Sequence, residues 1–244
     1  MEKTLNQLLK RTLKTAALLG ALTLAGAVQA GPTPVLKSVS SGLGVLDTST
    51  GLEWLQDWNL AKTSGYDSDG RMTWSQSIAW IAKLNADNYA GHSDWRLANA
   101  NATASSNCDS TFNPGGGLAP QYRGFKCTGS EMGHLFYNAL GGEVVESILN
   151  QTGDTEAEKA NLALFKNVKS SGYWSGTAYA PKSNFAWFFH TADGGQGHYN
   201  TDFSMYALAV RPGDVAAAVP EPQTLALTLI ALTGALLARR RRAL

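Results

Sequence analysis

The chain has 244 residues, and its 20 basic and 19 acidic side chains give a formal net charge of +1. The charge is unevenly distributed, because residues 31–218 contain 12 of the basic and 17 of the acidic side chains, a net charge of −5. An acidic surface repels nucleic acid and anionic lipid, so we expect no nucleic-acid partner, and polyanion binding would need a local basic patch.

The first 30 residues have the composition of a secretory signal peptide. A basic segment precedes an apolar run over residues 16–27, and Val28-Gln29-Ala30 supplies small residues where signal peptidase cuts. We therefore expect signal peptidase to remove residues 1–30 and the remainder to be exported. A first transmembrane helix is the alternative, although the run is short for a span. The basic residues are Lys3, Lys10, Arg11 and Lys14.

Turn and helix signals predict the first elements of the exported body. Residues 43–46 and 52–55 flank a turn that begins at Asp47, which predicts a hairpin. Residues 73–76 have the form of a capping box and begin a predicted helix, which is followed by an extended segment from residue 94. The apolar residues at helical spacing are Trp74, Ile78, Ile81 and Leu84.

Asp67-Ser-Asp-Gly70 admits two interpretations. Two carboxylates two positions apart before a glycine resemble the beginning of a calcium-binding loop. The remainder of such a loop is missing, since residue 71 is Arg and no Glu stands at the twelfth position. We therefore expect a turn, and no metal site or cofactor.

The two cysteines, Cys108 and Cys127, both lie in the exported part. An even number of cysteines outside the cytoplasm usually forms disulfides, and no further soft ligands stand at zinc-like spacing. We therefore predict a Cys108–Cys127 disulfide. Closing a loop of this length is worth about 3 kcal/mol in the chain-entropy model.

The segment between the cysteines contains a local cluster of aromatic and basic residues in an otherwise acidic body. Stacking on the rings and charge-assisted hydrogen bonds from a guanidinium suit an anionic glycan. The alternative is that the aromatic rings only pack the loop onto the domain. The candidate ligand-binding residues are Tyr122, Arg123, Phe125 and Lys126.

The second half of the body predicts two helices and then strands. Residues 128–131 can cap a helix over residues 130–140, and residues 155–165 form a more polar helix. The period then changes to two, which predicts strands over residues 173–178, 184–190 and 205–211. Helices followed by an antiparallel meander define an α+β class, here as a single domain over residues 31–213.

A linker over residues 214–218 leads to a tripartite C-terminus over residues 219–244. A Pro-Glu-Pro motif precedes an uncharged apolar run over residues 225–238, and four arginines follow it. Basic residues after an apolar segment stay on the cytoplasmic side of a membrane. The residues of the motif and of the cluster are Pro220, Glu221, Pro222, Arg239, Arg240, Arg241 and Arg242.

This order of motif, short transmembrane helix and arginine cluster resembles the PEP-CTERM sorting signal of Gram-negative bacteria. The resemblance implies transient anchoring in the inner membrane, cleavage near Pro220 by an exosortase, and release to the outer surface or the extracellular matrix. A plain tail anchor is the alternative. As a helix, however, the apolar run reaches only about 21 Å against a hydrocarbon core of about 30 Å.

Motifs along almost the whole body resemble the domain family named for the C-terminal domain of a bacterial collagen-like adhesin, the Lcl C-terminal domain. Two of the motifs depart from the family pattern: Ala98-Asn99 replaces Pro-Thr after the third motif, and Gly176 replaces Ser in the fourth. The resemblance implies a C-type-lectin-like fold, binding of sulfated glycans in the adhesin, and no enzymatic activity. The motifs are Thr50-Gly-Leu-Glu-Trp54, Met72-Thr-Trp74, Ser93-Asp-Trp-Arg-Leu97, Gly172-Tyr-Trp-Ser-Gly176 and Ala209-Val-Arg-Pro212.

Aromatic residues divide into two predicted groups. Those inside the motifs are expected in the core, namely Trp54, Trp74, Trp95, Trp174 and Trp187. Those between predicted elements are candidates for contact with a sugar, because aromatic faces stack on pyranose rings. These are Trp58, Tyr66, Tyr122, Tyr179 and Tyr199.

The sequence therefore predicts a non-enzymatic, exported surface or matrix protein that binds exopolysaccharide or another glycan, or has a structural role. The alternative is a glycoside-hydrolase-like enzyme with paired carboxylates. Candidate pairs are Glu53 with Asp57 and Asp193 with Asp202. Four histidines are candidate bases, of which His134 is expected to have a structural role, and Ser175 lacks the spacing of a nucleophile elbow.

The two predicted cleavages define both ends of the mature protein. The protein isolated from the cell surface or medium should lack residues 1–30 and the arginine cluster, and its C-terminus should lie near Val219. Intact mass spectrometry measures both ends. A surface form that retains Arg239 to Arg242 would favour the tail anchor.

Overall fold

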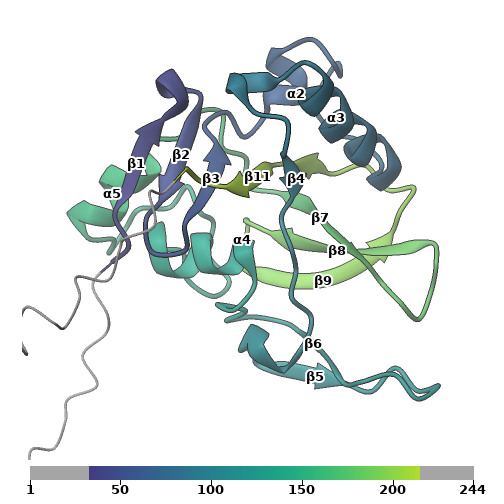
Figure 1. The fold of residues 1–244 in the computed structure, drawn as a ribbon. Coiled ribbons are helices and arrows are strands. Elements are labelled where there is room, and N and C mark those ends of the chain that lie inside the picture. The colour runs from purple at the N-terminus through teal and green to yellow at the C-terminus, as the bar shows by residue number, and fades with distance from the viewer. Residues whose placement is uncertain (1–32, 215–244) are drawn as a thin grey trace, which may run out of the picture. The chain divides into compact units, whose positions relative to one another are not determined.

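The computed structural model describes residues 33–214. The predicted signal peptide, most of the linker and the whole sorting signal lie outside the described residues. Within residues 33–214, no helix has the length and apolar character that crossing a bilayer requires. The described part is an α+β domain, as the order of the predicted elements indicates (Figure 1). It contains three sheets, whereas the sequence indicated a single antiparallel one.

The first sheet contains the predicted hairpin and is antiparallel throughout. Its strand order is β1-β2-β3-β11-β4, so the last strand of the domain lies between two strands that come much earlier in the chain. Val210 of β11 is in register with Trp54 on one side and Arg96 on the other. The strands are β1 (Leu36–Val39), β2 (Gly44–Asp47), β3 (Leu52–Leu55), β4 (Arg96–Leu97) and β11 (Ala209–Pro212), and the short helix η1 (Ser40–Gly42) joins β1 to β2.

The second sheet has the order β10-β7-β8-β9. Strands β7 (Gly172–Ala178), β8 (Phe185–His190) and β9 (Gly195–Asn200) form an antiparallel meander, and β10 (Tyr206–Ala207) is parallel to β7. The prediction of one strand over residues 205–211 is wrong. The chain passes from the second sheet to the first at the buried Leu208, so the apolar alternation runs through two strands with different neighbours.

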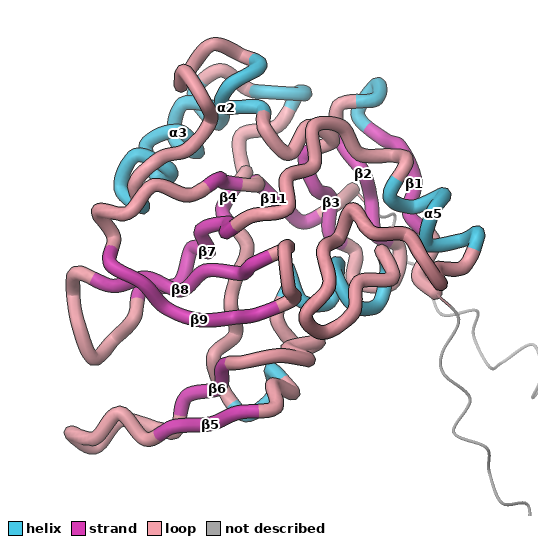
Figure 2. Tube along the Cα trace, turned by 180° about the vertical axis from the view of Figure 1, so that it is seen from behind, coloured by secondary structure: helices cyan, strands magenta, loops and turns pink. Residues whose placement is uncertain are grey.

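The third sheet pairs β5 (Ser110–Phe112) with β6 (Gln121–Arg123) and lies inside the segment between the cysteines. Seen from behind, this pair extends away from the second sheet, next to β9 (Figure 2).

Two helices begin at capping boxes, of which only the one at residues 73–76 is predicted from the sequence. Helix α3 (Trp74–Ala86) is capped by Thr73 and Gln76, and α5 (Glu156–Leu162) by Thr155 and Glu158. The helix predicted over residues 130–140 is α4 (Glu131–His134) followed by a π-helical turn, η4 (Leu135–Ala139). Its cap is the buried Ser130, which accepts a hydrogen bond from the backbone N–H of Gly133. The shorter helices are α2 (Leu60–Thr63), η2 (Tyr89–Gly91) and η3 (Ala104–Ser106).

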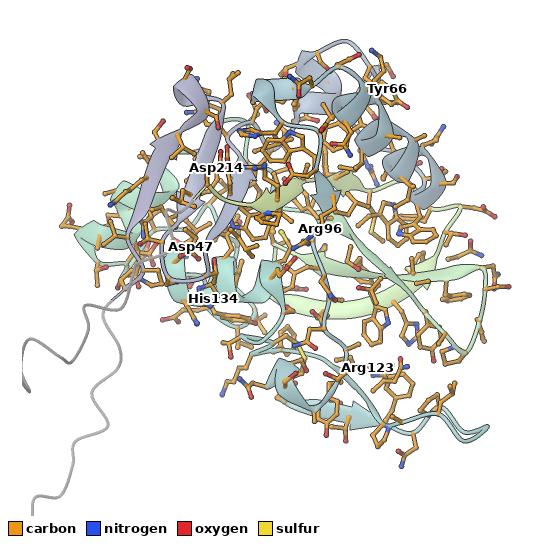
Figure 3. All side chains as sticks on the ribbon, in the orientation of Figure 1. Asp47, Tyr66, Arg96, Arg123, His134 and Asp214 are labelled. Carbon is orange, nitrogen blue, oxygen red and sulfur yellow. A yellow bond between two sulfur atoms is a disulfide. The ribbon has the colours of Figure 1, made fainter. Side chains whose placement is uncertain are left out.

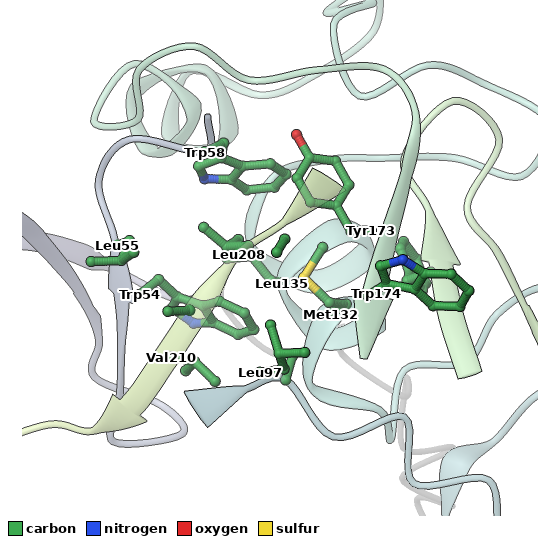
Figure 4. Close-up of a cluster of buried hydrophobic side chains, with 14 of the residues drawn as sticks. Trp54, Leu55, Trp58, Leu97, Met132, Leu135, Tyr173, Trp174, Leu208 and Val210 are labelled. Atoms are coloured by element: carbon green, nitrogen blue, oxygen red, sulfur yellow. The ribbon is translucent and has the colours of Figure 1, made fainter. Parts of the chain in front are cut away.

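The main core lies where the first two sheets and α4 meet (Figure 4). Of the five motif tryptophans, four are buried as predicted, and Trp74 is half-buried with its indole N–H donating to the Ser175 carbonyl at 2.8 Å. Trp58 and Tyr179 are also buried, so the expectation that they are available to a ligand in polar loops is wrong. Tyr66 and Tyr199 are exposed.

One helix position contradicts the predicted apolar face. Ile78 is 42% exposed, whereas Trp80 of the same helix is only 1% exposed. The buried positions of α3 are Ser77, Trp80, Ile81 and Leu84, so the apolar face is rotated away from Ile78.

A buried ion pair joins two strands of the first sheet. The guanidinium of Arg211 on β11 donates to the Glu53 carboxylate on β3 at 2.7 Å, and both side chains are buried. Asp94 and Asp214 accept two further hydrogen bonds from the same guanidinium. Burial lowers the pKa of Arg211, but these hydrogen bonds outweigh it, so the pKa is raised.

Substituting Arg211 should therefore be strongly destabilising. Arg211→Met leaves the Glu53 carboxylate buried without a cation and should lower the free energy of unfolding by about 3–5 kcal/mol. Chemical denaturation measures the loss. The double variant Arg211→Met/Glu53→Gln should recover part of it, since the uncompensated charge is then removed. A single variant within about 1 kcal/mol of the wild type would contradict this role.

Candidate functional site

The predicted disulfide between Cys108 and Cys127 is present. It closes the base of the segment that contains β5 and β6, which we call the stapled loop (residues 108–127). Beside the disulfide, the backbone N–H of Asp109 donates to the Phe125 carbonyl at 2.9 Å. A covalent bond and a backbone hydrogen bond thus hold the two ends of the loop together.

The stapled loop joins the second sheet at Gly124. Gly124 and Gln196 of β9 exchange backbone hydrogen bonds of 2.9 and 2.7 Å. Gly124 has φ of +94°, and a Cβ at this position would meet the Asp109 carboxylate, so glycine suits this junction. The loop therefore continues the edge of β9, and its side chains are placed relative to that sheet.

On one side of this junction, aromatic rings surround His198 of β9. The imidazole stacks on Tyr179 with a centroid distance of 3.9 Å and meets the edge of Trp187 at 5.4 Å. Phe112 from β5 and Phe185 from β8 lie 5.7 and 5.9 Å away. We call these five residues the His198 cluster. It joins the stapled loop to the meander, because Phe112 belongs to the loop.

Two cations lie over rings of the His198 cluster. The Arg123 guanidinium is 4.7 Å from the centroid of Phe112, and the Lys182 ammonium is 5.1 Å from that of Phe185. Neither has a carboxylate partner within residues 33–214, whereas Arg96 and Arg211 both do. Figure 3 shows Arg123 at the lower end of the molecule, away from Arg96. The two cations form a positively charged, aromatic surface on an acidic domain.

The surroundings of His198 disfavour a charged imidazole. Both of its ring nitrogens are buried and have no hydrogen-bond partner among the described residues. This burial, and then the positive charges of Arg123 and Lys182, lower the pKa of His198. These surroundings therefore favour the neutral form of the stacked ring.

On the other side of the junction is a pocket of about 310 Å³, which we call the Phe188 pocket. Phe125 and Phe188 supply aromatic walls, and Gly195 and Gly197 of β9 lie opposite His190 and Phe188 in the sheet register. A Cβ at Gly197 would stand 3.2 Å from the Phe188 ring. The missing side chains on β9 thus leave space beside the ring.

Polar groups of the Phe188 pocket converge at one end. His190 Nδ1 and Asp193 Oδ2 are 3.0 Å apart, and Asp193 Oδ1 accepts the Gly195 N–H at 2.8 Å. The carboxylate orients the imidazole, whose Nε2 has no partner among residues 33–214. Aromatic walls with a few convergent polar groups are typical of ligand pockets.

The four predicted ligand-binding residues do not form one cluster. Arg123 lies over the His198 cluster, and Phe125 lines the Phe188 pocket. Tyr122 is half-buried, and its backbone N–H donates to the Ala102 carbonyl. Lys126 is exposed next to the disulfide, and its backbone N–H donates to the Tyr137 hydroxyl at 3.1 Å. Residues that are close in sequence thus belong to two separate surfaces, the His198 cluster and the Phe188 pocket.

Two of the other candidates have structural contacts. His134 contacts the buried Asp47 at 3.2 Å, as Figure 3 shows, and is half-buried, which fits the predicted structural role. Burial raises the pKa of Asp47, but hydrogen bonds from His134 and Ser49 outweigh it and lower the pKa to about 2. Ser175 is buried, and its hydroxyl accepts the Thr177 N–H.

The proposed carboxylate pairs also have local partners. Glu53 is engaged by Arg211, and Asp57 accepts hydrogen bonds from Asn59 and Thr63. Asp193 contacts His190, and Asp202 is exposed.

The Asp67 segment is a turn. The Asp67 carboxylate accepts the backbone N–H groups of Asp69 and Gly70, at 3.0 and 2.7 Å. Residues 33–214 contain no group of three or more potential metal ligands.

Comparison with known proteins identifies the family. Residues 44–211 match the family model of the Lcl C-terminal domain, and the chain belongs to this family. The match begins at β2 and ends in β11, so it covers the second sheet and, apart from β1, the strands of the first. No curated protein and no solved structure matches the chain. The C-type-lectin-like topology that the resemblance implied therefore remains a prediction.

Sequence reasoning missed Lys182, Phe188 and the pairing of His190 with Asp193. The signal for the pocket was the Gly195-x-Gly197 repeat, which faces an aromatic strand across the sheet. This segment lacks apolar alternation, so it was not recognised as a strand.

The lowered pKa of His198 should make stability depend on pH. Because its pKa is lowered on folding, the unfolded chain binds more protons, and stability is lost as pH falls below the ordinary histidine value of about 6.5. Between pH 8 and pH 5, the wild type should lose more unfolding free energy than His198→Phe. Denaturation at each pH measures this difference, and equal losses would contradict it.

Proposed function

We propose that this protein is an exported, non-enzymatic component of the cell surface or extracellular matrix that binds anionic glycans. The sequence features of both ends support export by signal peptidase and sorting by an exosortase, with transient anchoring in the inner membrane. Membership of the Lcl C-terminal domain family supports a surface role, and a C-type-lectin-like fold is part of the proposal.

The observation that carries this proposal is the pair of cations over the His198 cluster. Residues 31–218 have a net charge of −5, yet Arg123 and Lys182 have no carboxylate partner within residues 33–214. Both are placed over aromatic rings, which limits their conformational freedom. A sulfate or carboxylate accepts charge-assisted hydrogen bonds from such groups, and Arg offers a planar, bidentate donor.

The Phe188 pocket supports the same function. Its volume of about 310 Å³ is at the lower end of the range for small-ligand pockets. The Phe125 and Phe188 rings provide faces for a pyranose, and His190 and Asp193 provide hydrogen-bonding groups for its hydroxyls.

A matched pair of polymers tests the proposal. The full chain should bind dextran sulfate and bind unmodified dextran at least tenfold more weakly, and added salt should weaken the difference. Arg123→Gln/Lys182→Gln should reduce affinity for dextran sulfate by at least tenfold, about 1.4 kcal/mol. Isothermal titration calorimetry measures each affinity, and thermal unfolding monitors the fold.

Lys83→Gln is the matched control. Lys83 is also an exposed cation, but it pairs with Asp87 on α3, so its removal should leave the affinity unchanged. An unchanged affinity of the double variant, or equal binding of dextran and dextran sulfate, would reject this function.

A further inference from the structure

A second pocket lies between α3, β4 and β7, apart from the stapled loop. It has a volume of about 300 Å³ and is open to solvent. Apolar side chains come from the helix and from β4, and polar groups come from β4 and the segments beside it. The side chains that line it are Ile78, Ile81, Arg96, Leu97, Asn99 and Thr177.

The apolar wall includes the side chain that departs from the helix prediction. Ile78 is 42% exposed and lies at this pocket, opposite Leu97 and Gly176. Gly176 keeps the pocket open, since a Cβ there would approach the Leu97 carbonyl at 3.3 Å. An apolar group of a ligand that covered Ile78 would remove this exposed surface from water.

The polar wall presents a neutral donor. Asn99 Oδ1 accepts the backbone N–H of Asn101 at 2.7 Å and the Thr177 hydroxyl at 3.1 Å. Thr177 Oγ1 in turn accepts the Ala100 N–H at 3.1 Å. These bonds fix the amide, so its oxygen is engaged and its Nδ2 group has no partner among the described residues.

The charge of the pocket is balanced within the protein. The two terminal nitrogens of Arg96 each donate to a different Glu131 oxygen at 2.7 Å, which is a bidentate pair. The Arg96 charge is therefore not available to an anionic ligand. The pocket differs in this respect from the His198 cluster, where the cations are unpaired.

We propose that this pocket binds the acetamido group of an N-acetylated sugar. The acetamido methyl packs against Ile78 and Leu97, and the carbonyl oxygen accepts a hydrogen bond from Asn99 Nδ2. The group is neutral and combines a small apolar end with an acceptor, which matches the two walls. This site shares no residue with the surface proposed for anionic glycans, so either proposal can fail alone.

Two disaccharides with the same backbone linkage test the site. The full chain should bind N,N′-diacetylchitobiose and bind cellobiose, which has hydroxyls in place of the acetamido groups, at least fivefold more weakly. Saturation-transfer NMR should give its strongest ligand signal at the acetamido methyl. Equal binding of the two sugars would overturn the proposal.

Two variants locate the binding. Asn99→Asp keeps the acceptor for Asn101 and Thr177 but replaces the free donor with an acceptor, and Ile78→Ser removes the exposed apolar contact. Each should weaken diacetylchitobiose binding at least fivefold. Ile78 is exposed, so its substitution is a test that does not depend on a change in stability.

Controls separate this site from other surfaces. Leu149→Ser removes another exposed aliphatic side chain of the same size as Ile78. Arg123→Gln removes one of the two cations that lie over the His198 cluster. Both should leave diacetylchitobiose binding unchanged. Unchanged binding in Ile78→Ser and Asn99→Asp, or an equal loss in Leu149→Ser, would show that the sugar binds elsewhere.

Discussion

The buried pairing of Arg211 with Glu53 is the constraint on which the domain depends. A charge in a core must be compensated there, and the pairing of β11 with β3 places Arg211 directly opposite Glu53. Once β11 is there, it also pairs with β4, so one strand unites segments from the beginning, middle and end of the domain. The core tryptophan Trp54 then lies next to Val210. In the first sheet, the ion pair thus favours one strand pairing, and the apolar side chains provide the buried surface.

Local signals in the sequence predict elements that local interactions stabilise. A capping box located α3, and turn residues located the hairpin, since each of these depends on neighbours within a few residues. The strand pairing at the end of the chain could not be predicted in this way. Residues 205–211 alternate continuously, and only the positions of β3 and β7 decide that the segment belongs to two sheets. Strand β9 contains two glycines, so it lacks the alternation by which strands are recognised.

The residues of the candidate site could likewise be predicted only in part from the sequence. Arg123 and Phe125 were identified from their residue types, but Arg123 lies over Phe112 whereas Phe125 lines the Phe188 pocket. The second cation at the His198 cluster is Lys182, which lies in the turn between β7 and β8 and belongs to no sequence motif. Composition therefore indicates which residue types are available, whereas the pairing of strands decides which of them act together.

The residues at the tip of the stapled loop contribute little to holding the domain together. The disulfide, the Gly124–Gln196 exchange and the β5–β6 pairs hold both flanks, and Gly115, Gly116 and Gly117 beyond them adopt positive φ with open space around each. Lengthening a closed loop adds entropy cost only slowly, about 0.6 kcal/mol per doubling. Related chains can therefore diverge in the length and composition of residues 113–120 while the framework stays the same. The tip is a position at which evolution, or grafting of a foreign peptide, has freedom to explore new contacts.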